Sequence, residues 1–187
     1  ELSKNGKILY VGTYSTGVIA VSTKDGTDVW HNSKSLTIES SPALSIDQGL
    51  LFVNGASGTI RAYNALSGDI RWEYTNIGGT ALRTKPVVSP DGAAVCFGRT
   101  NNDHKGAMYC RKTGTGESIW YHQAQVSSNG YSQGSVSTNP IISADGGVVF
   151  YMTTGQGTYW GYTLMAMNTL FPNFNNAARR SFNNQKW

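Results

Sequence analysis

The chain has 187 residues and a formal net charge of +4. This length suits one domain with a sizeable core, and no apolar run is long enough for a transmembrane segment. No acidic residue follows Asp145, whereas Arg179, Arg180 and Lys186 lie in an asparagine-rich tail. Because three basic residues without interleaved aromatic rings fall short of a nucleic-acid-binding patch, we expect a solvated tail and no nucleic-acid partner.

The first elements along the chain are two short apolar runs, residues 8–11 and 18–21, then a turn at Asp25-Gly26 and a run that ends at Trp30. Short runs that are rich in β-branched and aromatic residues and bounded by Gly, Asp and Asn are typical of β-strands. Their apolar residues are consecutive, which predicts strands that are buried on both faces between stacked sheets.

The following units repeat this order of elements, and a proline introduces each of them. Pro42, Pro86 and Pro140 head short apolar runs and lie 44 and 54 residues apart. Such a period indicates a repeat architecture, and four antiparallel strands in about 44 residues fit one blade of a β-propeller. We name these strands A to D, with the proline-headed run as strand A. Strand B is expected at residues 8–11, 50–53, 94–97 and 148–151, and strand C at residues 18–21, 60–63, 108–110 and 164–167.

Three units share a glycine that is followed four residues later by a tryptophan, between strands C and D. The glycine supplies the positive φ of a tight turn, and strand alternation then predicts that Gly26, Asp28 and Trp30 lie on one face. Because an aromatic side chain buries ~150–250 Å², we expect these tryptophans to seal one blade against the next rather than to bind a ligand. The structural pairs are Gly26 and Trp30, Gly68 and Trp72, and Gly116 and Trp120.

The repeats do not complete a ring. The first unit begins at strand B, the next two are complete, and the fourth follows the pattern only through strand C. Since propellers have about four to eight blades, we expect an all-β propeller of four-stranded antiparallel blades that is an incomplete ring or a fragment. Its blades are residues 1–41, 42–85, 86–139 and 140–168, and residues 169–187 form a basic tail or a late fourth-blade strand.

The frames of residues 20–30, 62–72 and 110–120 resemble the tryptophan-docking motif of PQQ-type propellers, Ala-x-Asp-x-x-Thr-Gly-x-x-x-Trp. Together with the proline-headed strands, the resemblance covers residues 4 to 168. It implies this fold and leaves the function open, because the family includes quinoprotein alcohol dehydrogenases, scaffolding lipoproteins of outer-membrane assembly and sensor domains without a quinone.

Two features depart from the motif. Its third position, usually Asp, is Ser22, Asn64 and Lys112 here, so the contacts at that position must differ. In the tail, residues 177–187 fit the frame only if Asn183 replaces the glycine, which asparagine allows because it tolerates positive φ. The competing frame places residues 166–168 on strand C and leaves the tail as an extension.

The two cysteines, Cys96 and Cys110, occupy adjacent strands B and C, where hairpin pairing places them opposite each other. Opposed residues have Cβ atoms ~4.5–5.5 Å apart, slightly beyond the ~3.5–4.5 Å of a disulfide. Two outcomes fit this geometry: a disulfide, which implies an oxidising extracellular or periplasmic compartment, or two buried thiols.

A quinoprotein dehydrogenase implies a bound PQQ, a Ca²⁺ ion with hard oxygen ligands and a carboxylate base, typically with a vicinal disulfide. Here no cysteines are adjacent, and most acidic residues lie at expected turns. His31, His104 and His122 have no ligand spacing and are expected at the surface or at strand ends. We therefore expect no catalytic residue and no metal ligand, and PQQ and Ca²⁺ only if the dehydrogenase interpretation holds.

The longest connections join strands B and C or lead from strand D to the next strand A, and both kinds emerge on one face of a propeller. They are residues 99–105, 123–138 and 153–162, which are polar, rich in glycine and interspersed with aromatic rings. Such rings can stack on a sugar or anchor a protein, or pack between neighbouring loops. The candidate binding residues are Arg99, Asn101, Asp103, His104, Tyr131, Gln133, Tyr159, Trp160 and Tyr162.

The favoured hypothesis is a non-catalytic binding or scaffolding module that uses these loops to bind a protein or glycan partner, together with the remaining blades of a longer chain. The alternatives are a fragment of a PQQ-dependent dehydrogenase and a structural component of an extracellular assembly.

Overall fold

The computed structural model describes residues 1–34, 36–75, 83–99, 106–123, 133–136, 138–155, 161–168 and 178–183. All regular structure in these residues is β-strand, arranged in antiparallel sheets that we call blades 1 to 4. Within the same ranges, no helix has the length and hydrophobicity needed to cross a membrane. The predicted all-β fold with four-stranded antiparallel sheets is confirmed.

The blades follow one another along the chain. Blade 1 consists of β1 (Ile8–Gly12), β2 (Val18–Ser22) and β3 (Asp28–Asn32), and blade 2 of β4 (Ala43–Leu44), β5 (Leu50–Gly55), β6 (Thr59–Asn64) and β7 (Ile70–Tyr74). Blade 3 consists of β8 (Val87–Val88), β9 (Ala94–Arg99), β10 (Ala107–Lys112) and β11 (Ser118–Gln123). Blade 4 consists of β12 (Gln133–Val136), β13 (Ile141–Ile142), β14 (Val148–Gly155), β15 (Gly161–Asn168) and β16 (Ala178–Asn183).

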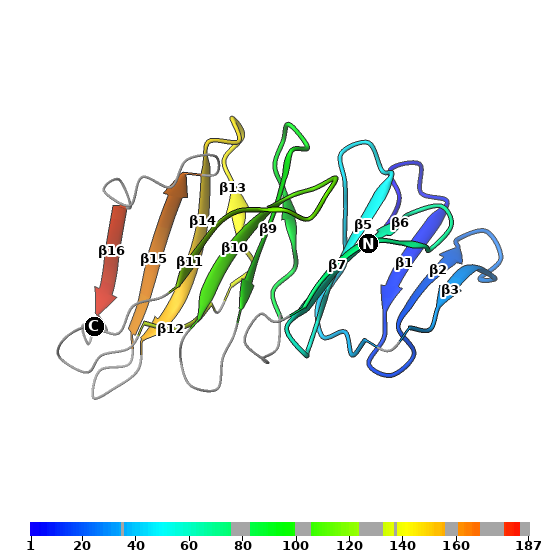
Figure 1. Cartoon of the computed structure of the whole chain (residues 1–187), viewed down its shortest axis with the longest axis horizontal. Helices are drawn as coiled ribbons and strands as arrows, with labels where there is room; N and C mark the ends of the chain where they lie inside the picture. Colours follow the sequence, from blue (N-terminus) through cyan, green and yellow to red (C-terminus); the bar gives the residue numbers. More distant parts are fainter. Residues whose placement is uncertain are drawn as a thin grey trace.

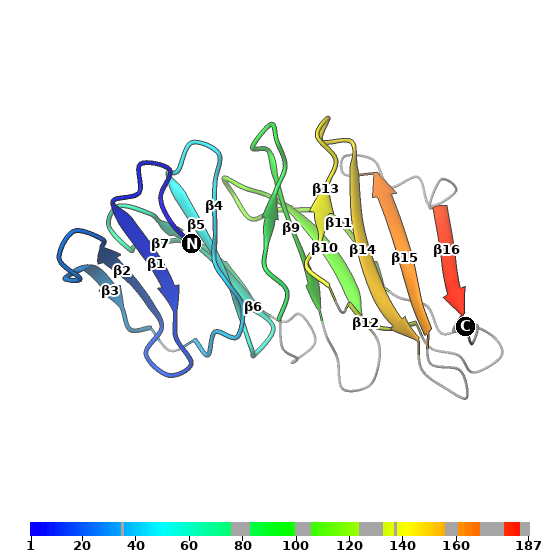
Figure 2. The same cartoon turned by 180° about the vertical axis from the view of Figure 1, so that it is seen from behind.

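The sheets stand face to face in a row, with blade 1 at one end and blade 4 at the other (Figures 1 and 2). The short A strands lie at one edge of the row, where β8 contacts both β4 and β13. Strands β5 and β9 are buried on both faces, as their consecutive apolar residues predict. Strand β1 differs, because Leu9 and Val11 are exposed.

Blade 1 also contains the end of a strand A, which the proline-based register does not detect. Leu2 pairs with Leu9 in an isolated antiparallel bridge, and the amide of Tyr10 donates to the carbonyl of Glu1. The prediction that this unit begins at strand B is therefore wrong. Residues 1–3 occupy the place that residues 43–45 have in blade 2.

Each A–B turn is closed by a serine and by an aspartate or asparagine two residues later. In blade 2, Ser45 Oγ donates to Asp47 Oδ1 at 2.6 Å, and the amides of Gly49 and Leu50 donate to Asp47 and Ser45. The Ser45 hydroxyl and then the Gly49 amide lower the pKa of Asp47. The same bonds recur at Ser3 and Asn5, Ser89 and Asp91, and Ser143 and Asp145.

In blades 1 to 3, strand D enters the sheet through a β-bulge. Val21 pairs with Asp28 and Ala20 with Trp30, so Val29 is an extra residue in β3. Equivalent register shifts follow Ala62 in blade 2 and Cys110 in blade 3. The predicted strict alternation from Gly26 to Trp30 is therefore wrong, because a bulge re-aims the side chains that follow it.

Two of the tryptophans lie on the C–D turn of the next blade. The Trp30 indole lies against Gly68, where an added Cβ would be 2.5 Å from the ring, and its Nε1 donates to the carbonyl of Ala65 at 2.9 Å. Trp72 lies against Gly116 in the same way, and its Nε1 donates to the carbonyl of Thr113 at 2.8 Å. These glycines have φ values of +77° and +72°, so both the turn and the indole require a residue without a side chain.

Blade 4 contains two strands that the sequence pattern does not define. Strand β12 lies between blades 3 and 4 in sequence and pairs with β14. Strand β16 pairs with β15 from Ala178, opposite Ala166, to Asn183, opposite Gly161. Part of the tail is thus the outermost strand of this sheet, and Asn183 lies in a strand rather than at a turn. Trp187 lies outside the described residues.

Candidate binding face

The antiparallel order of each blade places two kinds of connection at one end of the sheets, the B–C loops and the D–A connections. We call this end the connection face, and the opposite end, with the A–B and C–D turns, the turn face. On the connection face, the described residues that join blade 1 to blade 2 include Lys34 and Glu39. Those that lead into blade 3 include Arg83 and Lys85.

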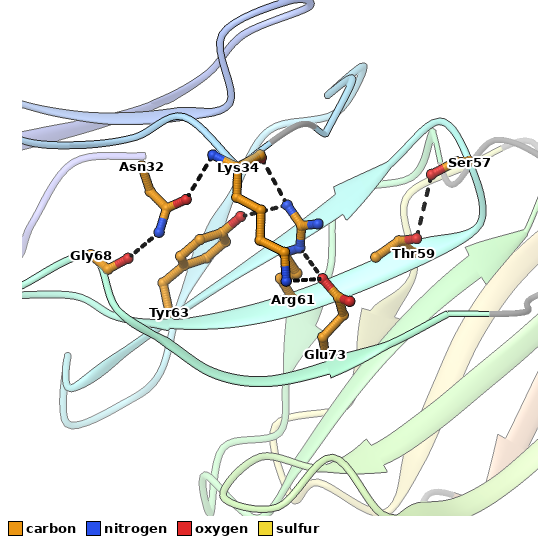
Figure 3. Close-up of polar contacts among 8 residues, drawn as sticks. All are labelled: Asn32, Lys34, Ser57, Thr59, Arg61, Tyr63, Gly68 and Glu73. Carbon is orange, nitrogen blue, oxygen red and sulfur yellow. Dashed lines mark hydrogen bonds and ion pairs between the residues drawn. The ribbon is translucent and has the colours of Figure 1, made fainter.

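A polar cluster fixes the first connection to the sheet of blade 2. Arg61, in β6, is 6% exposed and forms an ion pair with Glu73 of β7 (Figure 3). Its guanidinium also donates to the carbonyl of Lys34 at 3.0 Å, and the Lys34 Nζ lies 3.6 Å from Glu73. The hydrogen bond from Arg61 holds the pKa of Glu73 below its usual value, and burial raises the pKa of Tyr63 beside it. Glu73 is therefore ionised at neutral pH.

Charged pairs also join the connections near the A strands. Arg83 Nε donates to Glu39 Oε2 at 2.6 Å and links the segments that precede blades 2 and 3. Lys85 Nζ donates to Glu1 Oε2 at 2.6 Å, and the Lys85 amide donates to Asn139 Oδ1 at 2.7 Å. Lys85, which precedes blade 3, therefore contacts the first residue of blade 1 and the segment that precedes blade 4. These contacts hold the connections in fixed positions relative to one another.

Several side chains on this face still reach solvent. Tyr14, in the B–C loop of blade 1, is 72% exposed, and the side chains of Lys34 and Arg83 are 57% and 63% exposed. An exposed aromatic ring and two exposed cations on a rigid polar platform are groups that protein and sugar partners can contact. The sequence patterns did not single out these residues, although the position of Tyr14 in a B–C loop is a signal that could have found it.

Most of the predicted binding residues lie outside the described residues: Asn101, Asp103, His104, Tyr131, Tyr159 and Trp160. The structure places the other three in strands, so their assignment to loops is wrong. Arg99 ends β9 and is buried, Gln133 begins β12 and Tyr162 lies in β15. Strand pairing continues past the apolar runs, because backbone hydrogen bonds do not depend on the side chain.

The two cysteines form a disulfide between β9 and β10, where they are paired residues. Both are fully buried and pack with Trp120, Val149 and Met165 between blades 3 and 4. The disulfide is therefore part of the inter-blade core and lies away from solvent.

The histidines have different surroundings. His31 is exposed and its Nε2 lies 2.7 Å from the carbonyl of Thr16, as expected for a strand-end residue. His122 is buried, and its Nδ1 lies 2.8 Å from the hydroxyl of Tyr151 in the next blade. His122 lies near the end of β11, as the expected strand-end position allows, but it is not at the surface. His104 lies outside the described residues.

Most of the described acidic side chains are occupied by structural contacts. Asp47, Asp91 and Asp145 accept hydrogen bonds within the A–B turns, and Asp25 and Asp69 within the C–D turns. Every glutamate is in an ion pair: Glu1 with Lys85, Glu39 with Arg83, Glu73 with Arg61 and Glu117 with Lys112.

A quinone of this family is bound together with a Ca²⁺ ion, and Ca²⁺ requires several oxygen ligands that converge on one point. The contacts of the acidic side chains show whether the described residues could supply them. Among the described residues, no three His, Cys, Asp or Glu side chains come together. The A–B turn carboxylates are already bonded to serine hydroxyls and amides. The described residues do not fit this cofactor, and we derive no quinone chemistry from them.

Residues 3–176 match the family model described as outer membrane protein assembly factor BamB. The chain belongs to the BamB family of PQQ-like propeller repeats. Among curated proteins, no sequence matches it significantly. This family membership agrees with the four-stranded blades and with the indole contacts between them.

Solved structures show the same fold at low sequence identity. Quinohemoprotein alcohol dehydrogenase from Comamonas testosteroni is 15% identical with a TM-score of 0.72, and the match covers 93% of this chain and 33% of that one. BamB from Moraxella catarrhalis is 17% identical with a TM-score of 0.61, covering 91% and 57%. A europium-containing methanol dehydrogenase is 15% identical with a TM-score of 0.73, covering 89% and 39%. This BamB-family chain thus spans between a third and somewhat over half of these proteins.

Proposed function

We propose that the chain is part of a non-catalytic scaffold propeller that binds a protein partner through its connection face. The observation that carries this proposal is how the charged side chains are used. On the turn face, carboxylates close turns, and on the connection face, charged side chains tie consecutive blades together while Tyr14, Lys34 and Arg83 reach solvent. Such an arrangement holds a polar surface rigid, which reduces the ordering cost of binding.

The family match supports a protein partner, because its description names an assembly factor. The disulfide between Cys96 and Cys110 supports a periplasmic or extracellular location, since disulfides persist in oxidising compartments. The proposal also includes the predicted residues Tyr131, Tyr159 and Trp160, which lie outside the described residues.

Site-specific photo-crosslinking tests this proposal. A benzophenone amino acid at position 14 probes the connection face, and the same group at position 66 is a matched control, because Tyr14 and Leu66 are 72% and 74% exposed. We expect irradiation in the envelope fraction of the source cells to give a discrete protein adduct from position 14 and none from position 66. The Arg83→Glu variant should weaken the position-14 adduct. Equal labelling from both positions would contradict a role for this face.

The structural likeness to two dehydrogenases supports a second candidate, a segment of a quinone-dependent dehydrogenase whose cofactor is bound by other blades. The intact parent protein distinguishes the two functions. Dye reduction with an alcohol as substrate that depends on added PQQ and Ca²⁺ supports the dehydrogenase. The scaffold proposal predicts no such activity from protein that is folded and gives the position-14 adduct.

A further inference from the structure

Strand D forms the outer edge of each sheet, on the side opposite to strand A. In blade 3 this strand is β11, and within the described residues no other strand pairs with its outer edge. Alternate residues of an edge strand direct their backbone N–H and C=O groups away from the sheet, where an added strand can bind them. In this part of the chain, the outer edge of β11 is therefore a row of backbone donors and acceptors that is open to pairing.

The sequence of β11 differs from those of the other outer strands. Proteins commonly protect such edges with charged residues or proline, which disfavour pairing with a further strand. Each of the other outer strands has at least one charged residue: Asp28 in β3, Arg71 and Glu73 in β7, and Arg179 and Arg180 in β16. In contrast, β11 reads Ser-Ile-Trp-Tyr-His-Gln, and its histidine is buried. Among the outer strands that the structure describes, only β11 lacks these protecting residues.

A stack of aromatic rings crosses blade 3 and ends at this edge. Phe97, Tyr109 and Tyr121 lie directly opposite one another on β9, β10 and β11. The centroids of the Phe97 and Tyr109 rings are 5.6 Å apart and those of the Tyr109 and Tyr121 rings 5.9 Å apart, with planes inclined by 11° and 19°. Phe97 is fully buried, whereas Tyr121 is 57% exposed. The stack thus runs from the core to the outer strand, and its next ring would lie on a strand that pairs with β11.

The same positions in blade 2 have different chemistry. Arg61 pairs with Glu73 in the register that Tyr109 and Tyr121 have in blade 3, and Lys34 lies beside Glu73. A strand added to β7 would cover this ionised carboxylate, which costs free energy unless the partner supplies a matching charge. A strand added to β11 would instead cover the ring of Tyr121 and gain an aromatic cross-strand pair.

The other face of β11 is fixed by blade 4. Trp120 and His122 are 5% and 6% exposed, and His122 Nδ1 lies 2.8 Å from the hydroxyl of Tyr151 in β14. Because these alternate side chains hold the strand, an incoming segment meets an edge that is already extended. Only the segment itself then loses conformational freedom on binding.

We propose that the outer edge of β11 is a docking site for a protein partner, which adds one extended segment to blade 3 as an antiparallel strand. Main-chain hydrogen bonds to β11 hold the segment, and its side chains give the specificity. The residue opposite Tyr121 is aromatic, because it continues the ring stack, and its neighbours are uncharged, since β11 offers them no charged side chain. This site is separate from the connection face and does not rest on the function proposed for that face. A second copy of the chain is the competing occupant.

Amide hydrogen exchange of the 187-residue chain, followed by NMR, tests this proposal residue by residue. The probe is a synthetic peptide, acetylated and amidated at its ends, in which threonine and valine alternate around one central tyrosine. We expect the peptide to slow exchange of the β11 amides that do not bond to β10 about tenfold or more, because the added strand must then open before they exchange. The amides of β7, the equivalent strand of blade 2, are the internal control and should exchange at an unchanged rate.

Variants of the edge and of the peptide separate strand pairing from unspecific binding. Tyr121→Lys places a charge at the centre of the edge and should lower the affinity for the peptide about tenfold or more, whereas Tyr121→Phe keeps the stack and should bind as the wild type does. Leu66→Lys is the matched control, because it adds the same charge at an exposed turn. A peptide with alanine in place of its tyrosine should bind more weakly. A peptide with methyl groups on alternate backbone nitrogens should not bind, since it lacks the donors that face β11.

Three results overturn the proposal. The first is unchanged exchange of the β11 amides at the highest soluble peptide concentration, or equal protection of β7 and β11. The second is peptide binding that Tyr121→Lys leaves intact. The third is dimerisation of the chain in sedimentation velocity that Tyr121→Lys abolishes, because this assigns the edge to a second copy.

Discussion

The interface between blades 1 and 2 and the one between blades 2 and 3 share one framework and differ in the polar groups around it. In both, an indole lies on a turn glycine and donates to the carbonyl three residues before that glycine. The residue two after the tryptophan differs. Asn32 donates to the Gly68 carbonyl at 2.7 Å, whereas Tyr74 lies under the guanidinium of Arg111, 3.3 Å from its ring centroid.

The differences compensate each other within each interface. Arg111 donates to the Gly116 carbonyl, which is the equivalent of Gly68. The residue equivalent to Arg111 in blade 2 is Tyr63, whose ring stacks on Trp30. The Gly68 carbonyl thus accepts a hydrogen bond from the preceding blade, whereas the Gly116 carbonyl accepts one from its own blade. The comparison indicates that the indole framework fixes how blades stack, and that the neighbouring polar pairs can vary as long as buried carbonyls keep a donor.

The largest expected effect comes from removing an indole. Trp30→Ala and Trp72→Ala should each lower the free energy of unfolding by about 3 kcal/mol, because both leave a cavity between blades and an unbonded carbonyl. Urea denaturation followed by circular dichroism measures this. Trp72→Phe is the milder control, which keeps an aromatic six-membered ring but loses the pyrrole part of the indole with its N–H, and should cost about 1–2 kcal/mol. A much smaller loss for Trp30→Ala than for Trp72→Ala would show that the frameworks are not equivalent.

The turn glycines separate backbone strain from indole contact. Gly26→Ala should cost about 1 kcal/mol, because it only places an alanine at positive φ. Gly68→Ala adds a Cβ that would be 2.5 Å from the Trp30 ring, and should cost about 2–4 kcal/mol because the indole must also move. Thermal unfolding of both variants gives the comparison. Equal losses would mean that the indole does not depend on the missing side chain.

The framework could be predicted from the sequence because its signals are local. The proline before strand A, the turn glycine and the tryptophan recur in the same order, with the tryptophan always four residues after the glycine, and consecutive apolar residues mark strands B and C. The bulge at Val29 could not be predicted in this way, because it depends on how β2 pairs with β3. The A strand of blade 1 was missed because it lacks the proline, although Ser3 and Asn5 match the later serine and aspartate turns.

The contacts of the candidate binding face could be predicted from the sequence less well than the framework of the blades. Arg61 and Glu73 lie opposite each other on β6 and β7, so this pair depends on the strand register within blade 2. Arg83 and Glu39 are 44 residues apart in sequence and meet only because the blades stack. Arg99 was placed in a loop because the apolar run ends before it, yet its backbone continues the ladder opposite Ala107. Polar partners across an interface are set by tertiary structure, and no periodicity reports them.

The ion pair of the first interface should make it sensitive to acid. Glu73→Gln should lower the free energy of unfolding by about 1–2 kcal/mol at neutral pH, less than for a fully buried pair because water partly screens Glu73. Arg61 lowers the folded pKa of Glu73. This stabilisation is therefore present above the unfolded pKa of about 4.3 and is lost as the pH falls through the lower folded value.

Unfolding of the wild type and of Glu73→Gln across this pH range measures the effect. The difference between the two proteins should shrink toward zero in acid, even though the turn aspartates weaken both proteins together. A difference that stays constant with pH would show that the variant acts through packing rather than charge.

The smallest effect tests whether the polar pairs of the two interfaces are interchangeable. Tyr74→Asn removes the ring under Arg111, and Arg111→Tyr leaves the Gly116 carbonyl without its donor, so each should cost about 1 kcal/mol. The double variant recreates the pair of the first interface, in which an amide two residues after the tryptophan reaches the turn carbonyl and a tyrosine lies beside the indole.

A double-mutant cycle by urea denaturation gives the coupling, with Asn32→Ala as the matched loss of the amide in the first interface. The double variant should be about 1 kcal/mol more stable than the sum of the single losses predicts. Strict additivity would show that each polar pair depends on its own surroundings, such as Arg61 beside Tyr63 in one interface and Tyr109 in the other. Coupling of the expected sign would mean that the indole framework alone sets the geometry, so that polar pairs can be exchanged between interfaces of the same propeller.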